Sequence, residues 1–157
     1  GFSKTYAMDG WRLGWTVASE EMTRAILKVR QYTTVCVNTF IQYGAAEALS
    51  ADQSCVDHMV GEFSKRRTVM LDGLAKIPGL KVAEPKGAFY VFPDIRSFGK
   101  SSAEVADYLL NEHHIACVAG SVFGPSGEGH LRLAYSCSTE ECRKGVDRLR
   151  TALSALK

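Results

Sequence analysis

The sequence predicts an α/β protein in two parts: residues 1–50 as the tail of a large α/β domain, and residues 51–157 as a small α+β domain. Before residue 50, helical apolar spacing follows a short buried strand. Beyond Pro78, short strand-like runs alternate with helical ones. A long helix over about residues 53–77 joins the two parts, because it has the cleanest apolar stripe in the chain.

In the first part we expect the end of a buried strand at Gly14–Ala18, followed by two helices. Ser19 is a good N-cap for a helix that reaches about Tyr32. After an irregular stretch, Phe40–Ser50 is expected to form the second helix. Its small residues suit close packing against a neighbour: Gly44, Ala45, Ala46 and Ala48.

The second part is expected to contain four strands, at Leu80–Ala83, Ala88–Phe92, Ile115–Ala119 and His130–Ser136. Ser101 and Glu104 have the spacing of a capping box, which predicts a helix to about Glu112. Ser138 and Glu141 cap a last helix. The glycine-rich stretch at 120–129 lacks the lysine and hydroxyl residue of a nucleotide loop and precedes a strand, so we expect it to be structural.

Composition excludes several classes of function. The net charge is +2 and 46% of the residues are hydrophobic, so neither disorder nor a nucleic-acid or membrane-binding surface is indicated. No apolar run is long enough to cross a membrane, and the chain does not open with a signal peptide. The five scattered cysteines and the adjacent His113 and His114 lack metal-ligand spacing, so we expect reduced thiols in a cytoplasmic protein without a metal site.

Lys4 and Arg12 form the most informative pattern in the chain, because Arg12 lies between Gly10 and Gly14. If Gly10–Val17 is a strand, Arg12 shares a face with the two glycines, and a bulky anion can approach its planar fork of donors. A lysine beside such an arginine suits a phosphorylated aldehyde, whose imine the amine would form and whose phosphate the guanidinium would hold. Alternatively, Lys4 is a solvated charge and Arg12 an ordinary surface residue.

A second arginine lies in the strand expected at His130–Ser136. Alternation places Leu131, Leu133 and Tyr135 on the core face and Arg132 on the other, beside small residues that leave room for a ligand. An edge-strand charge pair is the alternative. Phe89 and Tyr90 either approach the mouth of a substrate site or simply pack a strand.

The run Gly1–Trp15 resembles the lysine segment of class I/II pyridoxal-phosphate-dependent aminotransferases, the aspartate aminotransferase superfamily of fold type I, and most closely its bacterial-type branch. Four more segments follow in that family's order: Gln42–Leu49, Pro85–Pro93, Gly120–Gly124 and His130–Ser136. Asp9 departs from the branch, which usually has threonine there. Whether its carboxylate tunes Arg12 or faces solvent stays open.

The resemblance implies a function for three residues. Lys4 would be the catalytic residue that binds pyridoxal 5'-phosphate covalently, Arg12 would bind the cofactor phosphate, and Arg132 would clamp the α-carboxylate of the substrate. The implied enzyme is a homodimer that moves an amino group between an amino acid and a 2-oxo acid. The substrate class (aspartate, aromatic or alanine type) is not resolved.

Family members are more than twice as long and have the lysine past their midpoint. We therefore expect this chain to be a C-terminal portion that begins at the lysine segment, with the ring-binding residues upstream, and to be inactive by itself. Two alternatives remain: a pyridoxal-phosphate lyase or synthase of the same fold, and an aminotransferase-like sensor domain of a transcription regulator. The amino-acid sequence of residues 7–12 favours the enzyme over the regulator.

Overall fold

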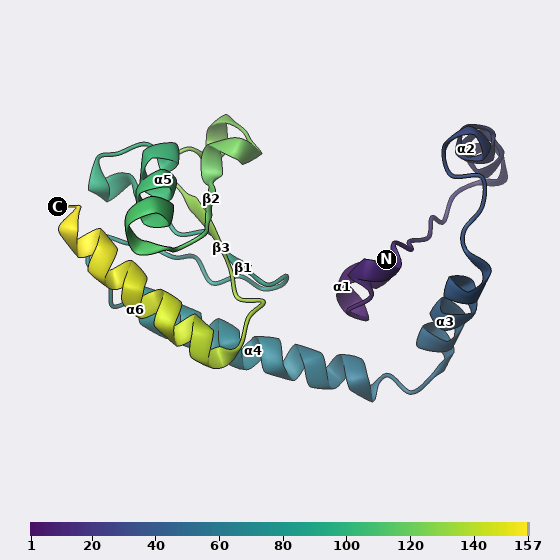
Figure 1. Ribbon diagram of the computed structural model, residues 1–157, viewed down its shortest axis with the longest axis horizontal. Helices are drawn as coiled ribbons and strands as arrows, with labels where there is room; N and C mark the ends of the chain where they lie inside the picture. Colours follow the sequence, from purple (N-terminus) through teal and green to yellow (C-terminus); the bar gives the residue numbers. More distant parts are fainter. Residues whose placement is uncertain (157) are drawn as a thin grey trace. The chain divides into compact units, whose positions relative to one another are not determined.

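The computed structural model describes residues 1–156 and divides into two compact units (Figure 1). Unit 1 is Gly1–His58, and unit 2 begins at Met59. The division falls inside helix α4 (Ser54–Leu74), which therefore contributes its first turn to unit 1 and the remainder to unit 2.

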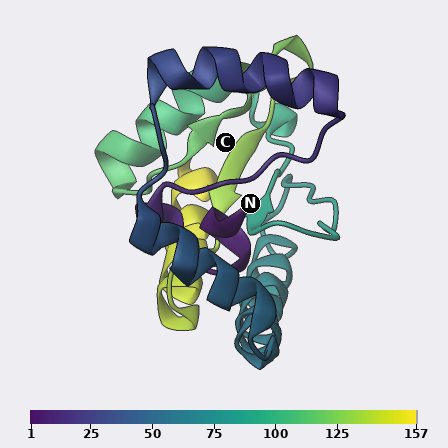
Figure 2. The same cartoon turned by 90° about the vertical axis from the view of Figure 1, so that its right-hand side faces the viewer.

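Unit 1 is helical, with α1 (Phe2–Thr5), a 3-10 turn η1 (Asp9–Trp11), α2 (Glu20–Thr33) and α3 (Thr39–Ser50). Figures 1 and 2 show α1 beside α3, with α2 apart from both. A small core explains the pairing, because Phe2, Met8 and Ala45 are buried together. The small residues of α3 do permit close packing, since the ring of Trp11 lies where a side chain at Gly44 would extend.

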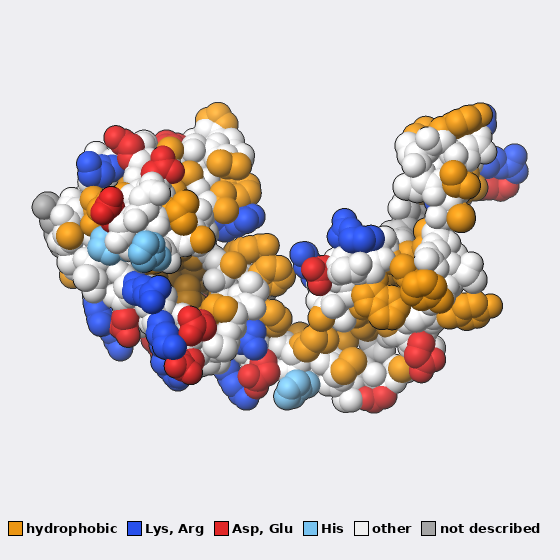
Figure 3. All heavy atoms as spheres, viewed as in Figure 1, with side chains coloured by type: hydrophobic (Ala, Val, Ile, Leu, Met, Phe, Trp, Pro, Cys, Tyr) orange, Lys and Arg blue, Asp and Glu red, His pale blue; other side chains and the backbone are white. Residues whose placement is uncertain are grey.

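Helix α2 begins where the sequence predicts, because the hydroxyl of Ser19 accepts a hydrogen bond from the backbone N–H of Met22 at 3.3 Å. Its apolar stripe is nevertheless exposed, and hydrophobic side chains gather on the surface of unit 1 (Figure 3). The exposed hydrophobic residues of α2 and α3 include Met22, Ile26, Leu27, Val29, Tyr32, Phe40, Tyr43 and Leu49.

The prediction of a strand at Gly10–Val17, with its end at Gly14–Ala18, is wrong. Gly10 belongs to η1, and residues 13–19 form neither helix nor strand. A strand needs a partner for its N–H and C=O groups, and every strand within residues 1–156 lies in unit 2. Trp15, within the segment expected to end a buried strand, is 59% exposed.

Unit 2 contains an antiparallel sheet in the order β1-β3-β2, made of β1 (Tyr90–Val91), β2 (Val118–Ala119) and β3 (Leu131–Ala134). Tyr90 lies opposite Ala134, and Val118 lies opposite Arg132. The central strand β3 confirms the strand predicted from His130. Two other expected strands shorten to β1 and β2, and the one at Leu80–Ala83 reduces to a single bridge between Lys81 and Asp94.

Three helices cover the apolar face of this sheet: α4, α5 (Ser102–His113) and α6 (Thr139–Ala155). A 3-10 turn, η2 (Arg96–Phe98), lies between β1 and α5. Helix α4 ends at Leu74, three residues before the expected end at 77. Helices α4 and α6 touch where Gly73 meets Val146. The predicted caps are present: Ser101 and Glu104 form the capping box of α5, and Ser138 caps α6.

The glycine-rich stretch forms two short 3-10 turns, η3 (Gly120–Phe123) and η4 (Pro125–Gly127). The backbones of Gly120 and Gly127 approach so closely that a Cβ on either would overlap a carbonyl of the other. The carboxylate of Glu128 then accepts hydrogen bonds from the N–H (2.7 Å) and hydroxyl (2.8 Å) of the fully buried Ser102. These contacts fasten the loop to the start of α5.

Within residues 1–156, no helix combines the length and apolar character that crossing a membrane requires.

Two glycines of α4 give a matched test of the packing in unit 2. Gly73→Ala places a methyl group against Val146, so we expect a loss of about 1–3 kcal/mol in the free energy of unfolding. Gly61→Ala, in the same helix, meets open space and should stabilise by about 0.5–1 kcal/mol, since alanine loses less backbone entropy. Urea denaturation measures both, and equal effects would contradict the α4–α6 contact.

The Glu128 contact should make stability depend on pH. The pKa of Glu128 is lowered, chiefly because the backbone N–H of Ser102 donates to its carboxylate and then because the Ser102 hydroxyl does so. A carboxylate with a lowered folded-state pKa contributes stability above its unfolded pKa and loses it as the pH falls through the folded value. Glu128→Gln should therefore be less stable than the unaltered protein at neutral pH.

That difference should shrink as the pH falls through the lowered folded-state pKa of Glu128, which thermal unfolding at neutral and at acid pH would measure. Asp107→Asn, an exposed change on α5, serves as the control. A Glu128→Gln deficit that is the same at both pH values would contradict the contact as drawn.

Candidate functional site

Lys4 lies in α1, the four-residue helix at the start of unit 1. Phe2 holds this helix in place, because its ring is 3% exposed and packs near that of Tyr6, with centroids 5.7 Å apart. The hydroxyl of Tyr6 donates to Oε1 of Gln53 at 2.9 Å, which connects the same segment to the residues just before α4. The Lys4 side chain itself is exposed.

Arg12 follows η1 in a left-handed backbone conformation, with φ 53° and ψ 44°. Non-glycine residues rarely adopt this region, and clustering of such residues is typical of ligand sites. Ala7, between Lys4 and Arg12, has the same φ of 53°. The Arg12 Nη1 donates to the backbone carbonyl of Asp9 at 3.1 Å. Asp9 thus contacts the Arg12 side chain through its backbone carbonyl.

Arg12 therefore lies in a left-handed turn after η1 and not in the predicted strand. Alternation along a strand does not apply, but the flanking Gly10 and Gly14 do have open space where their side chains would be. The neighbouring Trp11 anchors the turn against Gly44 of α3. A primary amine and a guanidinium therefore lie in one short segment whose course is fixed by the buried Phe2 and by the contact of Trp11 with α3.

Arg132 lies on β3, and the predicted alternation is confirmed. Leu131 and Leu133 are 0% and 6% exposed, and Tyr135 is 1% exposed, whereas Arg132 is half-buried on the opposite face. Tyr90, opposite Ala134 on β1, belongs to the same face as Arg132.

Two aromatic rings flank the Arg132 guanidinium. Its central carbon lies 4.6 Å from the centroid of Tyr90 and 4.8 Å from that of Phe123. This cation–π attraction acts on the positive charge and uses none of the N–H groups. It therefore orients the side chain and leaves those N–H groups able to donate to a ligand. Of the two aromatics considered from the sequence, Tyr90 reaches Arg132, whereas Phe89 stacks near Phe63, with centroids 5.7 Å apart.

Sequence reasoning missed Phe123, because it lies in the glycine-rich stretch that was expected to be only structural. Its ring also approaches Phe92 at 6.2 Å, and Phe92 stacks on His130 at 5.1 Å with an interplanar angle of 5°. The only available signal was the aromatic residue in a loop that leads directly to the arginine-bearing strand. A row of rings thus borders Arg132 on the face of the sheet away from the core.

Lys4 and Arg12 both belong to unit 1, and Arg132 belongs to unit 2. An amine and two guanidinium groups suit anionic ligands, with arginine able to bind phosphate or carboxylate through two parallel bonds. Within residues 1–156, no group of three or more histidine, cysteine or acidic side chains is placed to hold a metal ion. The chemistry indicated is that of a phosphorylated, carboxylate-bearing or carbonyl ligand.

Comparison with known proteins gives this arrangement a family. Residues 1–149 match the family described as aminotransferase class I and II. An aspartate aminotransferase of Pyrococcus horikoshii is 39% identical over 99% of this chain, which covers 40% of that protein. An aromatic-amino-acid aminotransferase of Thermococcus litoralis is 40% identical over the entire chain and 41% of its own length.

Solved structures agree with the sequence comparison. The crystal structure of an aromatic aminotransferase from Pyrococcus horikoshii superposes with a TM-score of 0.95 over 99% of this chain and 42% of its own, at 39% identity. A Thermus thermophilus aspartate aminotransferase mutant gives a TM-score of 0.89. The chain spans about 40% of the length of the curated relatives it matches. Its fold is part of the fold-type I aminotransferase fold, and the chain belongs to the class I and II aminotransferase family.

Proposed function

We propose that this chain is part of a pyridoxal-phosphate-dependent aminotransferase that moves an amino group between an amino acid and a 2-oxo acid. The observation that supports this most strongly is the match of residues 1–149 to the family, a range that includes Lys4 and Arg12. Relatives named as aspartate and aromatic aminotransferases support the transferase over a lyase or a sensor domain.

The residues present fit pyridoxal 5'-phosphate. Lys4 supplies an exposed primary amine for the aldehyde, and Arg12 supplies a guanidinium beside two glycines with open space for the phosphate. The left-handed turn at Arg12 is the kind of backbone strain that ligand sites accumulate. When bound, the cofactor supplies an electron sink for the substrate's α-carbon.

Arg132 orients the substrate in this proposal. Its planar fork binds the α-carboxylate at two points, which fixes the position of the α-carbon. The rings of Tyr90 and Phe123 hold the guanidinium in place and exclude water from its faces. The Lys4 amine, as general base, moves the proton at the substrate α-carbon.

We further propose that residues 1–50 belong to the large domain of the enzyme and residues 51–157, which begin with the long helix α4, to its small domain. The exposed apolar side chains of α2 and α3 need cover, and we propose that a second copy of the enzyme provides part of it in a homodimer. Sedimentation velocity of the full-length enzyme tests this, and a monomer at micromolar concentration would contradict it. Free thiols at all five cysteines suit the cytoplasm that we propose as its location.

Lys4 should be the residue that bonds the cofactor. We expect borohydride reduction of the full-length holoenzyme, followed by peptide mapping, to place the pyridoxyl group on Lys4. Lys28 in α2 and Lys65 in α4 serve as internal controls and should stay unlabelled. A label on either of them, with Lys4 unmodified, would remove Lys4 from the proposal.

Arg132→Lys should impair substrate binding while the cofactor still binds, because lysine keeps the charge but loses the two-point contact. We expect kcat/KM for the amino acid to fall, mostly through a higher KM. The fall should correspond to a loss of about 2–4 kcal/mol in transition-state stabilisation. Arg143→Lys, an exposed change on α6, is the matched control and should leave kcat/KM unchanged. An unaltered kcat/KM in Arg132→Lys would exclude Arg132 from the substrate site.

A further inference from the structure

Two of the five cysteines, Cys137 and Cys142, lie together at the start of α6. Their sulfur atoms are 3.6 Å apart, and both thiols are free. Ser138 is the N-cap of α6, so Cys137 is the residue just before the cap and Cys142 is the fourth helical residue. Side chains at these two positions pack together in many capped helices. The cap therefore holds the two thiols side by side by a local and robust geometry.

The two thiols differ in accessibility. Cys137 is exposed, whereas Cys142 is 3% exposed and belongs to the core of unit 2. The pKa of the Cys142 thiol is raised to about 11, chiefly by burial and then by its contact with Cys137, while the positive charge of Arg66 acts in the opposite direction. An oxidant from solution therefore meets Cys137 first, and Cys142 stays protonated behind it.

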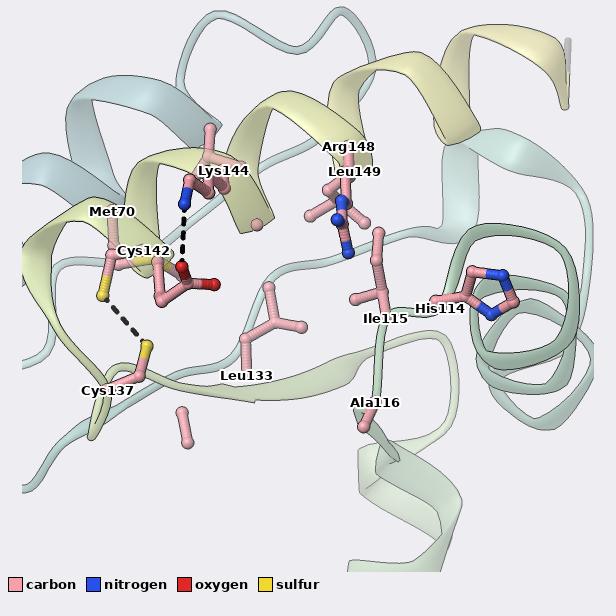
Figure 4. Close-up of a pocket in the computed structure, with 14 residues that line it drawn as sticks. Met70, His114, Ile115, Ala116, Leu133, Cys137, Cys142, Lys144, Arg148 and Leu149 are labelled. Carbon is pink, nitrogen blue, oxygen red and sulfur yellow. Dashed lines mark hydrogen bonds and ion pairs between the residues drawn. The ribbon is translucent and has the colours of Figure 1, made fainter.

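A cleft of about 290 Å³ opens over this pair (Figure 4). Both cysteines line it, together with Met70 and with Lys144 and Arg148 of α6. The lining includes these two cations and one carboxylate, that of Glu141, which binds Lys144 at 3.0 Å. Lys144 also binds Glu140 at 2.8 Å, so Arg148 is the cation of the lining that no ion pair within residues 1–156 neutralises. A small anionic molecule can thus reach the exposed Cys137 from solution beside Arg148.

We propose that Cys137 and Cys142 form a modification site, a dithiol that closes to a reversible intramolecular disulfide by exchange with a small anionic disulfide. The Cys137 thiolate attacks one sulfur of that disulfide, which forms a mixed disulfide and releases one thiol. The Cys142 sulfur, losing its proton to water, then attacks Sγ of Cys137 and releases the second thiol. The protein loses two electrons and two protons, and the small disulfide gains them.

The geometry requires little movement. The sulfur atoms are 3.6 Å apart and a disulfide needs about 2.05 Å, so they must approach by roughly 1.5 Å. The alternative is that the pair only packs the cap, as two small hydrophobic side chains would. The two cases differ in whether the buried Cys142 reacts.

Trypsin separates this pair from the other cysteines. Cleavage after Arg132 and Arg143 gives the peptide Leu133–Arg143, which contains only Cys137 and Cys142. The full-length protein would be treated with oxidised glutathione, quenched with acid, alkylated with N-ethylmaleimide and digested. We expect Leu133–Arg143 to lose two hydrogen atoms and take up no maleimide. Prior treatment with dithiothreitol should restore uptake of two.

The chain offers a matched control in the peptide Gln31–Lys65, which contains the exposed Cys36 and Cys55. These two should take up maleimide or glutathione separately. In Cys142→Ala, Cys137 should retain one glutathione, because no second thiol displaces it. In Cys137→Ala, Cys142 should be alkylated at least about tenfold more slowly than Cys137 in the unaltered protein, because it is buried.

We expect both variants to fold, because each change removes only one sulfur atom. Thermal unfolding of both variants checks this. Two results would overturn the proposal. One is a Leu133–Arg143 peptide that takes up two maleimides while Cys36 and Cys55 have reacted with glutathione. The other is a glutathione that persists on Cys137 in the unaltered protein, because it would mean that Cys142 does not resolve the mixed disulfide.

Discussion

The alternation of side chains along β3 is the constraint on which unit 2 depends. Leu131, Leu133 and Tyr135 must enter the core between the helices, so Arg132 must lie on the other face. Tyr135 secures this register beyond the strand, since its N–H donates to Phe89 O at 3.0 Å and its hydroxyl to Ala88 O at 3.1 Å. A slip of one residue would bury a guanidinium and expose the core, which makes the position of Arg132 a consequence of hydrophobic burial.

Local features were predicted from the sequence more accurately than non-local ones. The caps at Ser19, Ser101 and Ser138 form as expected because capping depends on residues within three positions of one another. Strand lengths were overestimated because a strand exists only where a partner pairs with it, and the partner is set by the tertiary fold. The strand expected at Gly10–Val17 is the clearest case, since its residue pattern contains no information about a neighbour.

The candidate site divides in the same way. For Arg132, residue alternation alone placed the side chain on the correct face, and what it could not supply was Phe123, which arrives from a loop through tertiary packing. For Arg12, the pattern of flanking glycines was informative but the assumed strand was not. Its environment comes from a left-handed turn and from the packing of Trp11 on Gly44, neither of which residue periodicity encodes.

The two arginines are therefore oriented by different physical means, and their strength as anion sites differs accordingly. Arg132 is half-buried between two rings, where an ion pair is weakly screened. Arg12 is exposed, with one donor bound to Asp9 O and the rest of its fork available. At 4 Å two unit charges attract by about 1 kcal/mol in bulk water but by about 4 kcal/mol near a protein surface. Phosphate binding at Arg12 should therefore depend mainly on the groups that exclude water around it, and the guanidinium alone would hold the anion only weakly.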